Sequence, residues 1–346
     1  MRRIFFIEEP IYEQDITPYW EQYAPQPHVL VCRLHTPIGM PGFHADHGEV
    51  FLPKLQELCA EHRIAEYLIW MYTPMALPFA QSLDPQLVIY DCMDELSAFL
   101  YAPPTLLAQE AALLEWADLV FTGGPSLFRA KRHRHPSVFC FPSSVDAIHF
   151  GRARNCEQAA DLRGLAHPRL GYYGVIDERI DQELLTAMAE THPEWQIVMV
   201  GPIVKINPHS LPQYPNIHYL GAREYRVLPS YLAGWDVCLL PFALNAATRF
   251  ISPTKTLAYM AAERLIVSTS ITDVAEPYSH IVAIGNSHTN FIRACEQVLS
   301  ADTHERASRL VGMRTVLAQT SWDTTVEQMH FIIQQTLLRE PLPMAA

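Results

Sequence analysis

Short apolar runs alternate with longer amphipathic segments along most of the chain, and the whole pattern occurs twice. In the first half, the runs expected to form strands lie at 3–7, 28–33, 67–71, 87–90, 119–122 and 138–141. The clearest amphipathic helices are expected between them, at 52–62 and 104–117. Buried strands that alternate with helices are typical of a parallel sheet with crossover helices. The first half therefore predicts one α/β unit of about 150 residues.

The segment 146–167 is poor in apolar residues and is followed by Pro168, which is typical of a linker. The alternation then restarts. Strands are expected at 169–173, 196–200, 217–220, 237–240, 266–268 and 280–283, and helices at 181–191, 229–233, 255–262, 290–300, 303–319 and 323–338. The domain boundaries predicted from this pattern are 1–150, a linker at 151–167, 168–320, and a final helix within 321–346. With 346 residues of which 49% are apolar, the chain can bury two cores.

Composition excludes several classes of protein. A net charge of −12, from 25 basic and 37 acidic residues, gives no support for nucleic-acid binding. The seven cysteines are scattered without a CxxC pair, which favours neither a zinc site nor a disulfide framework and fits a reducing cytoplasm. No run of about 18 apolar residues predicts a membrane span, and the apolar run at 4–7 is too short for a signal peptide.

One basic cluster, at 129–135, stands out on this acidic chain and contains Lys131, Arg132 and Arg134. Two interpretations remain open: a solvated helix face or loop, and contact with a phosphate or with anionic lipid headgroups at the inner face of the membrane. The oligomeric state is not indicated by the sequence.

Polar residues gather after the predicted strands of the first half, where a parallel sheet presents ligand-binding groups. Asp91, Asp94 and Glu95 follow the strand at 87–90. One of these carboxylates is expected either to cap the next helix or to face an acceptor hydroxyl and act as a base. Gly123 and Gly124 follow the strand at 119–122, where a tight turn is the alternative to a ligand-binding loop.

The second half has a similar series of strand ends. The segment 169–179 predicts a strand, a glycine turn at Gly174 and a helix start with Arg179, an arrangement that favours an anion. Gly201 and Lys205 follow the next strand. At 247–255, Ser252 is expected to be a helix N-cap with Pro253 at the first helical position. Lys255 in the first turn opposes the helix dipole, which suggests a bound anion as the alternative to a surface lysine.

Several signatures are absent or incomplete in the sequence. It contains no GxGxxG, GxxxxGK[ST] or GxSxG motif, which disfavours a Rossmann dehydrogenase, a P-loop NTPase and an α/β-hydrolase. His44, Asp46 and His47 have the spacing of metal ligands but lack an obvious third ligand, so a loop beside the cleft is preferred and no metal site is predicted.

The chain resembles bacterial GT-B glycosyltransferases, of the group often found beside UDP-galactopyranose mutase in polysaccharide gene clusters. The resemblance extends over about residues 4–300. The segments that carry it are YDCMDELSAF at 90–99, FTGGPSL at 121–127, FPSSVD at 141–146, GVIDER at 174–179 and FISPTKT at 250–256.

The resemblance implies an α/β GT-B fold, with two Rossmann-like doubly wound domains facing a central cleft. It implies that the first domain binds the acceptor, that the second binds a nucleotide-sugar donor with UDP as the expected nucleotide, and that the last helix crosses back to the first domain. Neither a cofactor nor a metal is expected, because cations and helix ends would hold the diphosphate. The resemblance also implies retention of anomeric configuration.

The same resemblance assigns roles to particular residues. Asp91 or Asp94 would face the acceptor, and Arg179 and Lys255 would neutralise the diphosphate. Gly174 would let the donor phosphates approach the backbone. The other residues expected on the donor side are Gly201, Lys205, Ser252 and Thr254.

The sequence departs from this family at the expected donor site. Relatives usually have a glutamate that binds the donor ribose where this chain has Ala258, a glycine where it has Glu263, and a further glutamate where it has Ala246. Loss of a charge-assisted hydrogen bond costs about 1.5 to 3 kcal/mol. The alternatives to a glycosyltransferase are therefore a non-catalytic GT-B protein that acts as a partner or scaffold, and a nucleotide-sugar epimerase of the same fold.

Overall fold

A computed structural model describes residues 3–339. The elements of the first half are β1 (Ile4–Ile7), β2 (Ile11–Tyr12), β3 (Tyr19–Gln26), β4 (Val29–Thr36), α1 (Gly48–Glu61), β5 (Leu68–Met71), α2 (Leu77–Ala80), β6 (Leu87–Cys92), α3 (Leu106–Trp116), β7 (Leu119–Thr122), α4 (Pro125–Lys131) and β8 (Val138–Cys140). Those of the second half are α5 (Ala147–Gly151), β9 (Arg169–Tyr173), α6 (Gln182–Thr191), β10 (Gln196–Val200), β11 (Ile217–Gly221), α7 (Leu228–Ala233), β12 (Val237–Leu240), α8 (Lys255–Ala261), β13 (Leu265–Thr269), α9 (Thr272–Tyr278), β14 (Ala283–Gly285), α10 (His288–Ser300), α11 (Thr303–Ala318) and α12 (Trp322–Leu338).

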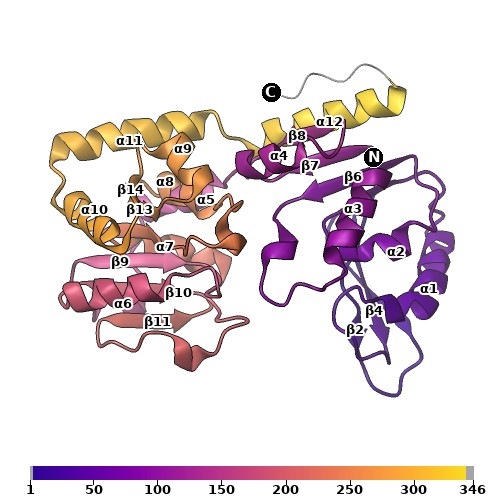
Figure 1. Ribbon diagram of the computed structural model, residues 1–346, viewed down its shortest axis with the longest axis horizontal. Helices are drawn as coiled ribbons and strands as arrows, with labels where there is room; N and C mark the ends of the chain where they lie inside the picture. The colour runs from indigo at the N-terminus through magenta and orange to yellow at the C-terminus, as the bar shows by residue number, and fades with distance from the viewer. Residues whose placement is uncertain (1–2, 340–346) are drawn as a thin grey trace.

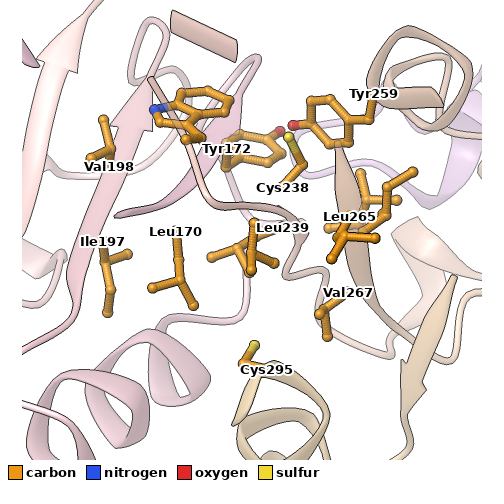
Figure 2. Packing of buried hydrophobic residues seen from close by; sticks show 14 of the residues in the cluster. Leu170, Tyr172, Ile197, Val198, Cys238, Leu239, Tyr259, Leu265, Val267 and Cys295 are labelled. Atoms are coloured by element: carbon orange, nitrogen blue, oxygen red, sulfur yellow. The ribbon is translucent and has the colours of Figure 1, made fainter. Parts of the chain in front are cut away.

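The second half forms one parallel sheet with the strand order β11-β10-β9-β12-β13-β14. This is the doubly wound order, in which the chain direction across the sheet reverses between β9 and β12. The four central strands, β9, β10, β12 and β13, are almost entirely buried on both faces, as parallel strands between two helical layers should be. Figure 2 shows this core around Leu170, Leu239 and Val267, with Cys295 of α10 packed against one side. The ligand-binding edge of the sheet is therefore expected where β9 and β12 end.

The first half contains two four-stranded sheets, where the sequence predicted one. One has the order β5-β6-β7-β8, and in the other β4 lies between β1 and β2 and also pairs with β3. The pairing of β3 with β4 is antiparallel, and β3 was not predicted. Phe6 on β1 and Tyr72 after β5 have ring centroids 6.4 Å apart, so the two sheets lie side by side. The expected α/β class with parallel sheets is confirmed, with this antiparallel addition.

The chain returns to its first half at the end. α12 lies along β6, β7 and β8 (Figure 1), and its Ile332 and Ile333 pack with Ile89 and Phe121 in one buried cluster. The segment predicted to be a linker is not extended, because α5 and two short 3-10 helices occupy it. The predicted strand at 280–283 begins later, at Ala283. Among the helices that the structure describes, none has the length and apolarity needed to cross a membrane.

Candidate functional site

The two halves meet at the carboxyl ends of their parallel strands, and an open cavity of about 450 Å³ lies between them. One wall consists of residues 97–102, which follow β6, and the opposite wall is Glu178, Asn245, Ala246 and Ala247. The Leu100 amide donates to Glu178 Oε1 at 2.9 Å and connects the two walls. The cavity therefore lies at the switch point between β9 and β12, where this fold places its ligands.

Arg179 and Lys255 lie together beside this cavity on the second half. Arg179 follows β9 and is held by Asp177, whose Oδ1 accepts from Nε at 3.0 Å and whose Oδ2 accepts from Nη2 at 2.6 Å. Burial disfavours the charge, but the hydrogen bonds and charge of Asp177 still raise the pKa of Arg179. Because one edge of the guanidinium is occupied by Asp177, Nη1 is the part best able to reach a ligand.

Lys255 is half-buried at the start of α8. Its Nζ lies 5.5 Å from the ring centroid of Tyr172 and 5.9 Å from that of Phe242. Burial, and after it the nearby charge of Arg179, lowers the pKa of Lys255 to about 8. No carboxylate within residues 3–339 forms an ion pair with Lys255. A partly buried ammonium group without a carboxylate partner is available to bind an anion.

Gly174 and Gly201 have positive φ angles of 139° and 154° and pack against each other. A Cβ at Gly174 would overlap Lys255 Cε, and a Cβ at Gly201 would overlap the Gly174 carbonyl. That Gly174 brings phosphates to the backbone stays a prediction; in this structure the space on its Cβ side is filled by the Lys255 side chain. The glycines let Lys255 approach the end of β9.

Asp94 reaches the same region from the first half. Burial raises the pKa of Asp94, and the charges of Arg179 and Lys255 partly offset that effect across the cleft. Asp91 lies elsewhere, buried at the end of β6, where Oδ2 accepts from Trp70 Nε1 at 3.0 Å. Burial raises the pKa of Asp91 to about 6. Of the two candidate carboxylates, Asp94 faces the cations.

Phe99 is a site residue that the sequence analysis missed. The Arg179 guanidinium carbon lies 5.3 Å from its ring centroid, and Lys205 Nζ lies 5.4 Å from it. Lys205 has a φ of 64° and is exposed after the end of β10. Phe99 is the last residue of the segment 90–99, which carries part of the family resemblance, so the sequence did draw attention to it. Nothing in the sequence showed that two distant cations converge on its ring.

Ser252 and Thr254 lie just before α8, and their predicted role at the donor site stays a prediction. The prediction that Ser252 caps the helix is wrong: α8 begins at Lys255, its N-cap is Thr254, and the Thr254 side chain makes no capping bond. Ser252 instead lies beside Gly124, where a Cβ would crowd it and overlap Asp273 Oδ2. Gly124 therefore permits a contact between the two halves, whereas Gly123 permits the close approach of the Met93 backbone within the first half.

That contact also involves α4 and α9. Asp273 is buried, and its Oδ1 accepts from the Ser126 amide at 3.0 Å. Arg129 and Glu276 form an exposed ion pair across the same contact at 2.9 Å. Sequence reasoning missed Asp273, because nothing local relates it to a helix 147 residues earlier.

The basic cluster at 129–135 is largely accounted for within the protein. The side chain of Lys131 is 1% exposed and forms ion pairs with Glu95 and Glu110, and Arg134 pairs with Glu110 at 2.7 Å. Of the two interpretations left open for this cluster, contact with a phosphate or a lipid headgroup is the less favoured, because of Lys131, Arg132 and Arg134 only Arg132 is both exposed and without a carboxylate partner among the described residues.

The residues where the chain departs from the resembled family also have clear positions. Ala258 is buried in α8, and Ala246 lines the cavity. Glu263 follows α8 with a φ of 54°, a conformation that favours glycine. Its carboxylate accepts from Arg154 at 3.1 Å and Arg314 at 3.0 Å. Within residues 3–339, no group of three or more His, Cys, Asp and Glu side chains is placed to hold a metal ion.

Comparisons with known proteins show which family model and which proteins this chain is similar to. Residues 167–301 match the family model "Glycosyl transferases group 1". A Bacillus subtilis (strain 168) protein named as a teichuronic acid biosynthesis glycosyltransferase, TuaH, is 24% identical over 297 residues, which cover 80% of this chain and 74% of that protein.

Solved structures share the fold over almost the whole chain. Sucrose-phosphate synthase from Thermosynechococcus elongatus aligns with a TM-score of 0.74 and 16% identity, covering 98% of this chain and 90% of that one. An Escherichia coli trehalose-6-phosphate enzyme, solved with UDP-2-fluoro glucose, aligns with a TM-score of 0.68 and 12% identity, covering 96% and 92%. These structures confirm the expected GT-B fold. The family model and the Bacillus relative confirm the expected glycosyltransferase class: this chain of GT-B fold matches a glycosyltransferase group 1 domain over residues 167–301.

Proposed function

We propose that this protein transfers a sugar from a nucleotide-diphosphate-sugar, most simply a UDP-sugar, to a glycan, lipid-linked or small-molecule acceptor, without a metal ion and with retention of configuration. The observation that carries the proposal is the convergence of Arg179 and Lys255 at the switch point of the second sheet, with Asp94 facing them from the first half. In this proposal the two cations serve the donor side and the carboxylate serves the acceptor side.

Glycosyl transfer proceeds through an oxocarbenium-like transition state, with negative charge growing on the departing diphosphate. The free Nη1 edge of Arg179 and the ammonium of Lys255 would stabilise that charge at fixed positions. Since these two residues supply the positive charge, no metal is needed in this proposal. Asp94 would orient the acceptor hydroxyl or accept its proton.

The names of similar proteins support the substrate class. TuaH is named for teichuronic acid biosynthesis, and the aligned E. coli structure was solved with a UDP-sugar analogue. These names favour a UDP-linked donor and a role in polysaccharide assembly for this chain as well. We propose no membrane contact through the cluster at 129–135, because its central lysine is buried.

Titration calorimetry with UDP tests the donor site. We expect the wild-type protein to bind UDP without added metal, and Arg179→Gln to weaken binding about 10-fold or more, the loss expected for one charge-assisted hydrogen bond. Arg163→Gln is the matched control, because Arg163 is an exposed arginine paired with Glu157. The proposal is wrong if the wild-type protein binds UDP, GDP and dTDP no better than Arg179→Gln does.

The absence of a glutamate at Ala258 and Ala246 favours a second candidate, a non-catalytic GT-B protein that acts as a scaffold. Ala258→Glu separates the two. Failure of both the wild type and Ala258→Glu to bind any of the three nucleotides at millimolar concentration would favour the scaffold. Conversion of a UDP-sugar to its epimer without any acceptor would instead indicate an epimerase.

A further inference from the structure

A buried charge cluster lies behind the loop that carries Asp94. Lys131, the last residue of α4, donates to Glu110 Oε1 at 2.6 Å, and its Nζ lies 2.7 Å from Glu95 Oε2. Arg134 pairs with the other oxygen of Glu110 at 2.7 Å, and the Tyr90 hydroxyl donates to Glu110 at 3.2 Å. Two cations thus balance two carboxylates, as a buried set of charges requires.

The two carboxylates of this cluster have different surroundings. Glu110 lies in α3, and its side chain is 2% exposed. Glu95 lies in the loop after β6, directly after Asp94, and its side chain is 17% exposed. Both Glu95 oxygens have partners, because Ser97 Oγ donates to Oε1 at 2.8 Å and Lys131 lies against Oε2. The loop is therefore fixed at Glu95 to a lysine in the core.

The same loop carries the first half's contribution to the cleft. Asp94 precedes Glu95 and lies in the field of Arg179 and Lys255. Phe99 follows four residues later, and both Arg179 and Lys205 lie over its ring. A shift of this loop by about 1 Å would be enough to disturb transfer by a large factor.

We propose that Lys131, acting through Glu95, is a positioning residue for glycosyl transfer, because it holds Asp94 and Phe99 in place against the donor-side cations. The inference rests on the proposed function, since it assigns Asp94 to the acceptor side of that site. A lysine that only stabilised the core would need Glu110 and not a second carboxylate in the cleft loop.

Glu95→Ala and Glu110→Ala are the informative variants. Lys131→Met would leave Glu95 without its cation and Glu110 with Arg134 alone, and is expected to fold poorly. Glu95→Ala keeps the Lys131–Glu110 pair in the core and releases the loop. Glu110→Ala keeps the Lys131–Glu95 pair and removes a core partner. A structural role predicts the larger functional loss in Glu110→Ala, whereas a positioning role predicts it in Glu95→Ala.

The activity measurement is UDP release from UDP-glucose, or from whichever UDP-sugar the wild type hydrolyses, at a temperature where all variants are folded. We expect Glu95→Ala to lower kcat about 10-fold or more, with KM within about threefold of wild type. Glu95→Gln, which can still accept from Lys131, should restore part of kcat. Glu110→Ala should unfold at a lower temperature than Glu95→Ala but keep kcat within about threefold.

Hydrogen exchange of residues 93–101 supplies a readout that needs no activity. Glu95→Ala should speed exchange in this segment, and Glu110→Ala should not. Equal exchange in wild type and Glu95→Ala, or equal kcat, would overturn the proposal. If the wild type neither binds UDP nor hydrolyses a UDP-sugar, the proposed function fails, while the exchange result still decides whether Lys131 and Glu95 fix the loop.

Discussion

Replacing Lys255 by methionine should weaken the binding of UDP and make the unliganded protein more stable. Lys255 is half-buried near Arg179, and burial and that charge lower its pKa to about 8. Methionine keeps most of the side-chain length and fits beside Gly174 and Tyr172. Loss of a charge-assisted hydrogen bond to a phosphate costs about 1.5 to 3 kcal/mol, which is about 10- to 150-fold in Kd.

The pH dependence makes this prediction specific to Lys255. A diphosphate binds the charged form, so wild-type affinity should be highest below pH 8 and fall by up to about tenfold per pH unit above it. Lys255→Met should lack this decline. Calorimetry with UDP between about pH 6.5 and 9.5 measures both effects. A change in Kd below about threefold at pH 7, or the same decline with pH in the variant, would refute the reasoning.

Lys255→Met should raise the stability of the unliganded protein although it weakens UDP binding. Because the pKa of Lys255 in the folded state lies below its ordinary value of 10.5, the folded protein binds fewer protons between about pH 8 and 10.5. Wild-type stability therefore gains from this group as pH rises through that window, and Lys255→Met should already have this gain at pH 7. Thermal unfolding should show a higher Tm for the variant. Lys54→Met, which removes a lysine paired with Glu57 on α1, is the control.

Four further sets of substitutions probe other parts of the structure. Asp91→Asn should raise the free energy of unfolding at pH 7 by up to about 3 kcal/mol. The pKa of Asp91 in the folded state is raised to about 6, so the stability of the wild type falls as pH rises from about 4 to 6. Urea unfolding at pH 4 and 7 measures this difference, and an equal change at both pH values would contradict it. Asp94→Asn should lower kcat for UDP-sugar hydrolysis by about 10² or more with UDP affinity kept within about threefold, and unchanged kcat would remove Asp94 from the acceptor side. Asp273→Ala should lower stability by about 1 to 2 kcal/mol, because it removes the hydrogen bond from the Ser126 amide. Arg129→Gln, which breaks the exposed ion pair of the same interface, should cost less than about 1 kcal/mol. Equal losses of stability in denaturant unfolding would show that the buried hydrogen bond is not the stronger contact. The stability of Glu263→Gly should stay within about 1 kcal/mol of that of the wild type, because relief of backbone strain at a positive φ offsets the loss of two ion pairs. Glu263→Ala should be the less stable of the two variants in the same assay.

Much of the fold could be predicted from the sequence because its strands are buried on both faces. Such strands appear as continuous apolar runs between helical patterns, and β6, β7, β9, β10 and β12 were all expected at or near their observed positions. β3 was missed because its residues 19–26 mix aromatic side chains with Glu21, Gln22 and Pro25, and because it is half-exposed. The division of the first half into two sheets depends on pairing between strands, which no local pattern reports.

The candidate site was predicted in part, and the limits have a physical cause. Arg179, Lys255 and Gly174 follow strand ends, and topology brings the ends of parallel strands together. Whether a charged residue is available for a ligand depends instead on partners that are distant in sequence. Lys131 appeared to belong to a surface cluster because Glu95 and Glu110 are 36 and 21 positions away in the chain. Asp177, in contrast, is two residues from Arg179, and that spacing could have indicated their ion pair.

A crystal structure of the wild-type protein soaked with UDP would test the central claim most directly. The account predicts that the diphosphate lies in the cleft, with its oxygens within hydrogen-bond distance of Arg179 Nη1 and Lys255 Nζ, on the side of the cavity opposite Phe99. UDP bound elsewhere, or a diphosphate in the cleft that touches neither cation, would contradict it.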